Sequence, residues 1–234
     1  MISIIIATYN EAGNIEEMID RIFKYIPPPV EVIVVDDDSD DGTWQKVIAM
    51  DRLGVHPVTL IRRTRERGLA SAILRGIIEC HGDIIGWWDC DMMMCPEKAP
   101  EMIATLKDHD IALGSRYVNG GGDKRDVIHV LSSVAINRVA GFVLGYGIKD
   151  YDSGFLMIRR DVLNLCLPVP TGFGEYCIEF MYCCIKRGAK VIEVPYVLTD
   201  REHGISKARH SNVKFILYGI RYLIRIAVAK VRGR

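Results

Sequence analysis

The sequence predicts an α/β protein with a mostly parallel central sheet flanked by helices on both faces. The main observation is that short apolar runs of strand length alternate with helix-like segments through the first third of the chain, a pattern typical of parallel sheets. The second is that 234 residues can bury one large core, and no repeat or low-complexity tract divides them. We therefore expect one domain.

The first third supplies four strands and three helices. The opening apolar run ISIIIA and the β-branched run VEVIVV are strands, and the prolines at 27–29 end the helix between them. The expected strands cover 2–7, 30–35, 58–61 and 83–88, and the expected helices cover 16–25, 41–50 and 70–80.

The second half is less regular but continues the same alternation. A glycine-rich loop at 119–123 precedes a long helical pattern, and the last segment has no helix breaker except Gly219. The expected strands cover 112–115, 155–158 and 190–194, the expected helices 127–144, 175–187 and 211–231, and a loop 200–209.

The charges are unevenly distributed although the chain is neutral overall, with 30 basic and 30 acidic residues. Residues 201–234 hold nine Lys or Arg against one acid, Glu202, which gives +8, so the first 200 residues carry −8. A basic tail predicts an anionic partner such as phosphate, nucleic acid or a membrane face.

The last helix carries its basic residues in a narrow stripe. At about 100° per residue, all but one of the five fall on one side of an otherwise apolar helix; the stripe is Lys214, Arg221, Arg225 and Arg232, with Lys230 opposite. This pattern favours a helix lying in the membrane interface. The alternative is a helix docked on its own domain with the basic side in water. The regular spacing of charges argues against a membrane-spanning segment.

The seven cysteines indicate a reducing compartment. They include no CxxC pair, and Cys183 and Cys184 are adjacent within an apolar pattern, which suits buried thiols better than disulfides. We expect neither a disulfide framework nor a zinc site. The chain opens directly on a strand, so no signal peptide is expected.

Polar residues follow three of the expected strands. They are Thr8 to Glu11, Asp36 to Ser39, and Asp89 to Asp91. Ligands bind at the carboxyl ends of strands in such sheets, although aspartates here could also serve only as turn and helix-cap residues. Asp89 and Asp91 should project from one side of an extended chain, where their repulsion calls for a cation or a shifted pKa.

Taken in order, these motifs resemble a known family. The segments IIIATYNEAGNI, VIVVDDDSDDGT, RERGLASAILRGI, WWDCDMMMCPE, GSRYVNGG, DYDSGF and DREHGISK are similar to those of the polyprenyl-phosphate sugar synthases, the group that includes the dolichyl-phosphate mannose synthases. The resemblance runs from about Ser3 to Lys207. It implies an inverting glycosyltransferase of the GT-A (Rossmann-like) fold, with a catalytic domain at 1–210. The basic amphipathic helix at 211–234 follows this domain and is expected at the membrane interface.

The resemblance also implies roles for particular residues. Asp89 and Asp91 should hold Mg²⁺ or Mn²⁺, hard cations that take oxygen ligands and share them with substrate phosphates. Residues expected at the nucleotide base and ribose are Tyr9, Glu11 and Asp37; those expected to hold the diphosphate and the lipid phosphate are Arg116, Arg201 and Lys207, which with Asp91 form the expected catalytic set.

Two departures from the family pattern concern the metal and the acceptor. Met93 stands where the mannose synthases carry a glutamine that helps to ligate the metal, and a thioether is a poor ligand for a hard cation. The run 92–95 could form a soft wall beside the substrate or pack in the core. Where the family has an arginine pair, this chain has His129 and Val130, so the acceptor phosphate could be bound by Lys124 or Arg125 instead.

The resulting functional hypothesis is the transfer of a hexose to a polyprenyl or dolichyl monophosphate with inversion. Mannose from GDP-mannose is favoured; a UDP-hexose donor, transfer to a polysaccharide hydroxyl, and a non-catalytic nucleotide-sugar-binding subunit are the alternatives. A lipid monophosphate is already anionic near neutral pH, its second pKa being about 6, so no general base is needed.

The expected location is the cytoplasmic face of a membrane, where the enzyme is peripheral. It should contact the membrane surface, through its basic helix or with a membrane-protein partner, and no nucleic acid, because no nucleic-acid-reading motif accompanies the basic tail.

Overall fold

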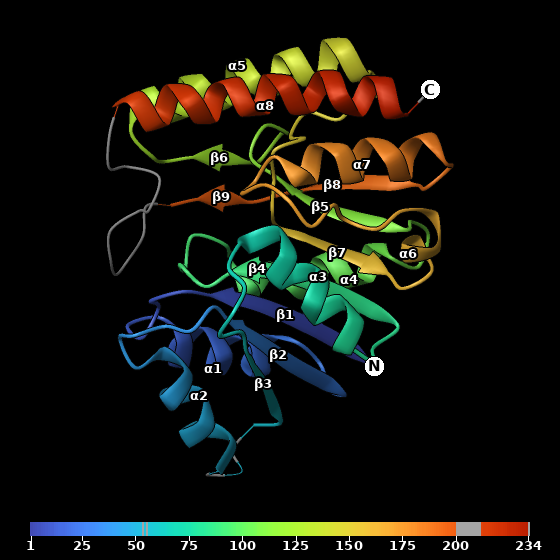
Figure 1. Cartoon of the computed structure of the whole chain (residues 1–234). Helices are drawn as coiled ribbons and strands as arrows, with labels where there is room; N and C mark the ends of the chain where they lie inside the picture. The colour runs from blue at the N-terminus through green and yellow to red at the C-terminus, as the bar shows by residue number, and fades with distance from the viewer. Residues whose placement is uncertain (53, 55, 200–211, 234) are drawn as a thin grey trace.

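The protein is built around one seven-stranded sheet, seen through the middle of Figure 1. The computed structural model describes residues 1–52, 54, 56–199 and 212–233, with side chains of 212–216 excepted. The strand order is β3-β2-β1-β4-β7-β5-β8, and a separate two-stranded sheet pairs β6 with β9. The strands are β1 Ile2–Thr8, β2 Val30–Asp36, β3 Val58–Arg62, β4 Ile84–Asp89, β5 Ile111–Ser115, β6 Gly122–Asp123, β7 Leu156–Arg159, β8 Val191–Pro195 and β9 Val197–Leu198.

The expected α/β architecture with a mostly parallel sheet is confirmed. Each pairing in the seven-stranded sheet is parallel except those of β7, which runs antiparallel to both β4 and β5. Because β7 reverses direction between them, β4 and β5 run the same way and end at the same edge of the sheet.

Helices cover both faces of the sheet. Alternate residues of β1 separate the two cores: Ile4 and Ile6 pack with α1 and α4, whereas Ile5 packs with α3 and α7. The helices are α1 Ile15–Tyr25, α2 Thr43–Arg52, α3 Leu69–Glu79, α4 Ala99–Thr105, α5 Val127–Leu144, α6 Val162–Leu165, α7 Tyr176–Lys186 and α8 Asn212–Arg232, with a 3₁₀ turn η1 at Pro96–Lys98.

The C-terminal helix α8 docks on the rest of the protein. It lies along α5 at the top of Figure 1 and also contacts α7. Ile226 and Ala229 are 2% and 1% exposed in the core shared with α7. Arg225 and Arg232 both bind Glu179 of α7, at 2.7 and 2.9 Å. Part of the basic stripe therefore faces the protein itself, unlike the expectation that it faces lipid or water.

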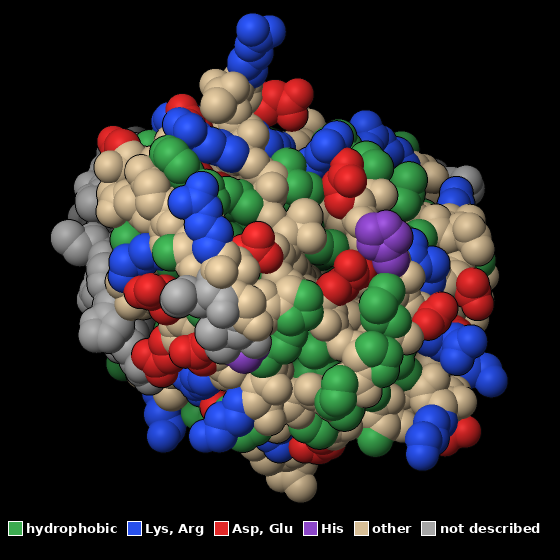
Figure 2. All heavy atoms as spheres, turned by 90° about the horizontal axis from the view of Figure 1, so that it is seen from below, with side chains coloured by type: hydrophobic (Ala, Val, Ile, Leu, Met, Phe, Trp, Pro, Cys, Tyr) green, Lys and Arg blue, Asp and Glu red, His purple; other side chains and the backbone are tan. Residues whose placement is uncertain are grey.

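The outer surfaces of α5 and α8 are instead apolar, and we call them the α5/α8 face. Ten of the fifteen exposed large apolar side chains among the described residues lie there: Val127, Ile128, Leu131, Val139 and Phe142 on α5, and Leu217, Ile220, Leu223, Ile224 and Val231 on α8. In contrast, acidic and basic side chains are interspersed on the opposite face, seen from below in Figure 2. Among the described helices only α5 is long and apolar enough to cross a membrane, a property that the sequence analysis assigned to no segment.

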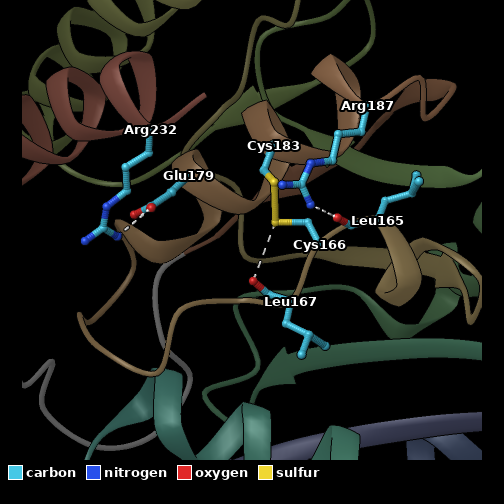
Figure 3. Close-up of a disulfide and its surroundings, with 7 residues drawn as sticks. All are labelled: Leu165, Cys166, Leu167, Glu179, Cys183, Arg187 and Arg232. Carbon is cyan, nitrogen blue, oxygen red and sulfur yellow. Dashed lines mark hydrogen bonds and ion pairs between the residues drawn. A yellow bond between two sulfur atoms is a disulfide. The ribbon is translucent and has the colours of Figure 1, made fainter. Parts of the chain in front are cut away.

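One expectation about the cysteines is wrong. Cys183 of α7 forms a disulfide with Cys166, just after α6 (Figure 3). Adjacent helix residues project about 100° apart, so Cys184 points into the core as the expected buried thiol while Cys183 points toward the segment after α6. The pairing joins residues 17 apart in sequence, and it was missed because it depends on how α6 turns back onto α7.

The docking of α8 leads to a prediction about stability. Ile226→Ala should lower the free energy of unfolding by about 2–4 kcal/mol, because it leaves a cavity in the core. The matched change Ile224→Ala, on the same helix but 57% exposed, should lower it by about 0.5 kcal/mol or less. Urea unfolding measures both values, and equal effects would contradict the docked position of α8.

Candidate active site

The predicted site residues gather at the carboxyl edge of the sheet. In the strand register, Thr8 at the end of β1 lies beside Asp36 of β2, and Ala7 lies beside Asp89 of β4. The strand β5 ends at the same edge with Ser115, so the next residue, Arg116, joins them. Four strand ends thus converge, as expected for a ligand site in a parallel sheet.

A buried carboxylate fixes the loops after β1 and β2. Asp36 is fully buried and accepts hydrogen bonds from the Thr8 hydroxyl at 2.7 Å and from the backbone and hydroxyl of Ser39 at 2.9 and 2.7 Å. The Ser39 hydroxyl in turn accepts from the backbone N–H of Asn10 at 2.9 Å. This part of the aspartate-rich motif is therefore structural, as the turn interpretation held, and it sets where the neighbouring Asp37 lies.

Asp37 is bound by Arg63 and by Gly68, the last residue of the RERG segment at 65–68. Its carboxylate accepts from Arg63 Nε at 2.7 Å and from the Gly68 backbone N–H at 2.7 Å, and it is 6% exposed. The Arg63 guanidinium also donates to the Gly68 carbonyl at 3.0 Å. Arg63 lies two residues before the RERGLASAILRGI motif and was not among the predicted site residues, because a partner 26 residues from Asp37 leaves no periodic signal.

The other two residues predicted for the nucleotide lie beside Asp37. Glu11 is 6% exposed, and its carboxylate accepts from Asn14 Nδ2 at 2.8 Å. The Arg67 guanidinium lies 4.8 Å from the centre of the Tyr9 ring and donates to its hydroxyl at 3.1 Å. The structure thus brings Tyr9, Glu11 and Asp37 to one edge, where an aromatic ring and carboxylates suit a base and ribose hydroxyls. Their roles stay predictions.

Asp89 and Asp91 lie at and just beyond the end of β4. Asp91 is 8% exposed and accepts from the backbone N–H of Met93 at 3.2 Å. Within the described part of the chain, no group of three or more His, Cys, Asp or Glu could hold a metal ion. The donor set is therefore two carboxylates, which fits Mg²⁺ or Mn²⁺ only where phosphate oxygens or waters complete the coordination.

The methionine run serves packing. Met92 and Met94 are 3% and 6% exposed in the core on the α1 side of the sheet, and Met93 packs against that core. Of the two roles left open for these residues, core packing is the one that the structure shows.

Arg116 is the centre of a buried charged cluster. Its Nε and Nη2 donate to the two oxygens of Asp150 at 2.8 and 2.6 Å, and its backbone N–H donates to Asp150 at 2.9 Å. Asp123 and Asp152 lie 3.6 and 3.7 Å from the guanidinium. Burial opposes its charge, but the hydrogen bonds and charge of Asp150 raise the pKa of Arg116 well above its usual value.

The cluster holds more carboxylates than cations. Arg116 and Arg125 face Asp123, Asp150 and Asp152, and Arg125 is held by Asp123 at 2.6 Å. Burial raises the pKa of Asp152 to about 6, with the attraction of Arg116 opposing the shift and the repulsion of Asp150 adding to it. Asp152 is therefore the member of the cluster that takes up a proton near neutral pH.

The residues predicted for the acceptor phosphate are only partly placed. Arg125 is paired with Asp123, and His129 binds Asp126, the residue that caps α5, at 2.6 Å. Lys124 lies in the loop just before α5, and Val130 lies in the first turn of that helix. Arg201 and Lys207 lie outside the described residues.

The sequence of this chain matches a known protein family and several characterised relatives. Residues 3–166 match the family described as glycosyl transferase family 2. The dolichol-phosphate mannosyltransferase of Pyrococcus furiosus is 37% identical over 96% of this chain, and the match spans 63% of that protein. The polyprenol monophosphomannose synthase of Mycolicibacterium smegmatis is 32% identical over 99% of this chain and 87% of that protein.

A solved structure confirms the fold. Glucosyl-3-phosphoglycerate synthase from Mycobacterium tuberculosis, crystallised with Mn²⁺, uridine diphosphate and glucosyl-3-phosphoglycerate, superposes with a TM-score of 0.72 at 19% identity. The match covers 98% of this chain and 79% of that one. At this identity the likeness establishes the expected GT-A fold.

The raised pKa of Asp152 makes stability depend on pH. A carboxyl with a folded-state pKa of about 6 against an ordinary value of 3.8 binds its proton more tightly when folded, so its contribution to the free energy of unfolding falls as pH rises through that window. Asp152→Asn carries no such proton. Relative to wild type, this variant should gain on the order of 1–3 kcal/mol between pH 4 and pH 7.

Urea unfolding at both pH values measures the gain, with Asp161→Asn as the control because Asp161 is 80% exposed. An Asp152→Asn variant whose stability differs from wild type by the same amount at both pH values would contradict the perturbed pKa.

Proposed function

The chain belongs to glycosyl transferase family 2, and from that premise we propose that it transfers a hexose, mannose favoured, to a polyprenyl monophosphate with inversion. GDP-mannose is the favoured donor. The proposal is supported by relatives named as dolichol-phosphate and polyprenol-phosphate mannosyltransferases that match at least 96% of this chain.

The observation that carries the proposal is the convergence of carboxylates and cations at one edge of the sheet. Glu11 and Asp37 lie after β1 and β2, Asp89 and Asp91 at the end of β4, and Arg116 after β5. A donor lying along this edge would place its nucleoside beside Glu11 and Asp37. Its diphosphate would then lie beside Asp89 and Asp91. The acceptor phosphate would then approach from the Arg116 side.

The chemistry requires positioning more than proton transfer. The lipid phosphate is anionic near neutral pH, so one of its oxygens attacks the anomeric carbon while the bond to the nucleoside diphosphate breaks, which inverts the configuration. Asp89 and Asp91 would hold Mg²⁺ or Mn²⁺, which when bound neutralises charge on the departing diphosphate. Arg116, and outside the described residues Arg201 and Lys207, would orient the phosphates.

The α5/α8 face suits the lipid acceptor. A polyprenyl phosphate is embedded in a membrane, and an apolar surface with exposed Arg138 and Arg221 on the same helices matches a bilayer with anionic headgroups. This face, rather than the basic stripe alone, would keep the enzyme peripheral at the cytoplasmic surface of the membrane, with or without a membrane-protein partner.

Other functions remain distinguishable. A UDP-hexose donor would leave the mechanism unchanged. Transfer to a polysaccharide hydroxyl would need a general base close to the acceptor, and a nucleotide-sugar-binding subunit would bind donor without turnover.

The first experiment is transfer from a panel of labelled GDP- and UDP-sugars to a polyprenyl phosphate, with and without EDTA. Transfer from one donor, lost with EDTA, is expected. Asp91→Asn should lower the rate at least about 100-fold, because several kcal/mol of charge stabilisation is lost.

Asp40→Asn is the matched control for this change, since Asp40 is exposed in the loop after β2 and should keep its activity. If the protein binds a donor but transfers sugar from none of the GDP- and UDP-sugars in the panel, the proposed reaction is wrong.

Membrane binding gives a separate prediction. Phe142→Ser should weaken sedimentation with vesicles of phosphatidylcholine and phosphatidylglycerol at least about fivefold, because Phe142 is 92% exposed on α5 and an aromatic ring gains much by burial in lipid. Ile78→Ser, 68% exposed on α3, should bind as wild type does. Equal binding by all three proteins would exclude the α5/α8 face as the membrane contact.

A further inference from the structure

The C-terminal helix contributes one side chain to the charged cluster at the candidate active site. The hydroxyl of Tyr222, on α8, lies beside the carboxylate of Asp152, one of the carboxylates facing Arg116. The fit is close, because a Cβ atom added to Gly174 would overlap the Tyr222 hydroxyl and would lie 3.9 Å from Asp152 Oδ1. A glycine is therefore needed where this hydroxyl meets the cluster.

The other helix of the α5/α8 face reaches the same cluster. Asn137 of α5 is 4% exposed, and its Oδ1 accepts from the backbone N–H of Asp152 at 3.1 Å while its Nδ2 donates to Asp150 at 3.3 Å. Asn137 thus binds both aspartates of the DYDSGF motif, and Tyr222 lies beside the second of them. The helices whose outer sides are apolar are tied by their inner sides to the neighbours of Arg116.

The two aspartates hold Arg116 unequally. Asp150 makes a two-pronged contact with the guanidinium at 2.6 and 2.8 Å, whereas Asp152 stays 3.7 Å away. An anionic phosphate that binds Arg116 must compete with both carboxylates, and with Asp123 at 3.6 Å, which Arg125 also binds. Of the two, Asp152 is the one whose distance leaves room to move closer, and the Tyr222 hydroxyl lies beside it.

We propose that Tyr222 is a positioning residue, which holds the Asp152 carboxylate away from Arg116 so that this arginine can bind the acceptor's phosphate. The proposal rests on the proposed function, in which Arg116 orients the lipid phosphate. It makes acceptor binding depend on the seating of α8 against α5 and α7. A lipid surface that binds the α5/α8 face would therefore also keep Tyr222 in the position that leaves Arg116 accessible to the acceptor.

The charge state of Asp152 supports this role. Competition with a phosphate requires an ionised carboxylate, so it should be strong above the pKa of Asp152, about 6, and weak below it. Charged and titratable groups surround the pair of Asp152 and Tyr222. Those near Asp152 are Arg116, Arg125, Asp150 and Cys177 of α7, and Glu175 is near Tyr222.

The test is the KM for polyprenyl phosphate in Tyr222→Phe, which keeps the ring and removes the hydroxyl. At pH 7.5 the KM should rise roughly fivefold relative to wild type, with a smaller change in kcat, as expected for the loss of one hydrogen bond. At pH 5.5 the ratio of variant to wild type should return toward one. Taking the ratio at each pH removes the titration of the lipid phosphate itself.

Three further proteins separate positioning from packing: Asp152→Asn, the double variant with Tyr222→Phe, and Tyr218→Phe. In an Asp152→Asn background, the Tyr222→Phe change should leave KM unaltered at both pH values, because the competing charge is absent. Tyr218→Phe, one turn earlier on α8 and packed against Phe173, should match wild type. A KM ratio that is the same at both pH values and in both backgrounds, or no rise at all, would overturn the proposal.

Wild type, Tyr222→Phe, Asp152→Asn and the double variant also distinguish this proposal from the proposed function. If wild type transfers no sugar to polyprenyl phosphate, the function fails and Arg116 loses its assigned ligand. The contact between Tyr222 and Asp152 is still measured by urea unfolding, as a coupling energy that is present at pH 7.5 and reduced at pH 5.5. An absent coupling would contradict the positioning contact whatever the substrate is.

Discussion

The pairing of Arg116 with Asp150 is the interaction on which the rest of the site depends. Both side chains are almost fully buried, at 5% and 0% exposure, so neither charge could stay in place without the other. Removing one partner of such a pair typically costs about 3–5 kcal/mol, because the remaining charge is left buried and uncompensated. The pair joins the end of β5 to the DYDSGF loop before β7, and through Asn137 it also fixes α5.

This pairing changes how a phosphate-binding role for Arg116 must be understood. An arginine predicted from sequence to hold phosphate is usually pictured on an open surface, but here it is surrounded by Asp123, Asp150 and Asp152. Buried carboxylates keep the guanidinium fixed and cationic before any ligand arrives, which lowers the entropy lost on binding. The same carboxylates weaken the attraction of Arg116 for an anion. Asp152 lies farthest from the guanidinium, at 3.7 Å, so its charge state has the largest effect on anion binding.

Periodicity predicted the long elements well and the short ones poorly. Expected and observed ends of the seven long strands and of the helices at 127–144 and 211–231 differ by at most two residues, because apolar runs and proline stops mark them locally. The elements β6, β9, α4 and α6 were missed. A strand of two residues or a helix of four is stabilised by its tertiary contacts rather than by its own sequence pattern. The antiparallel course of β7 likewise depends on connections, not on residue types.

For the site, sequence motifs identified which residues belong at the sheet edge but not how they are paired. Asp37 with Arg63, Arg116 with Asp150, and Cys166 with Cys183 are all contacts between separate elements. The helical wheel of α8 had the same limit. It found a basic side, but only the positions of α5 and Glu179 determine that two of those arginines bind Glu179 and that the outer side is apolar.

The methionines after Asp91 explain why the metal and the donor should bind together. Met92 adopts a left-handed backbone with φ of 61°, a conformation that costs about 1 kcal/mol or more outside glycine, and its side chain is buried with Met94 in the core. That packing anchors the turn carrying Asp91, whose carboxylate accepts from the Met93 backbone. The side chain of Met93 offers no oxygen, so within the described residues the protein supplies two carboxylates to a cation that takes six or more ligands. Most of the coordination would then come from diphosphate and water, and the free energy of metal binding would depend on the donor already being present.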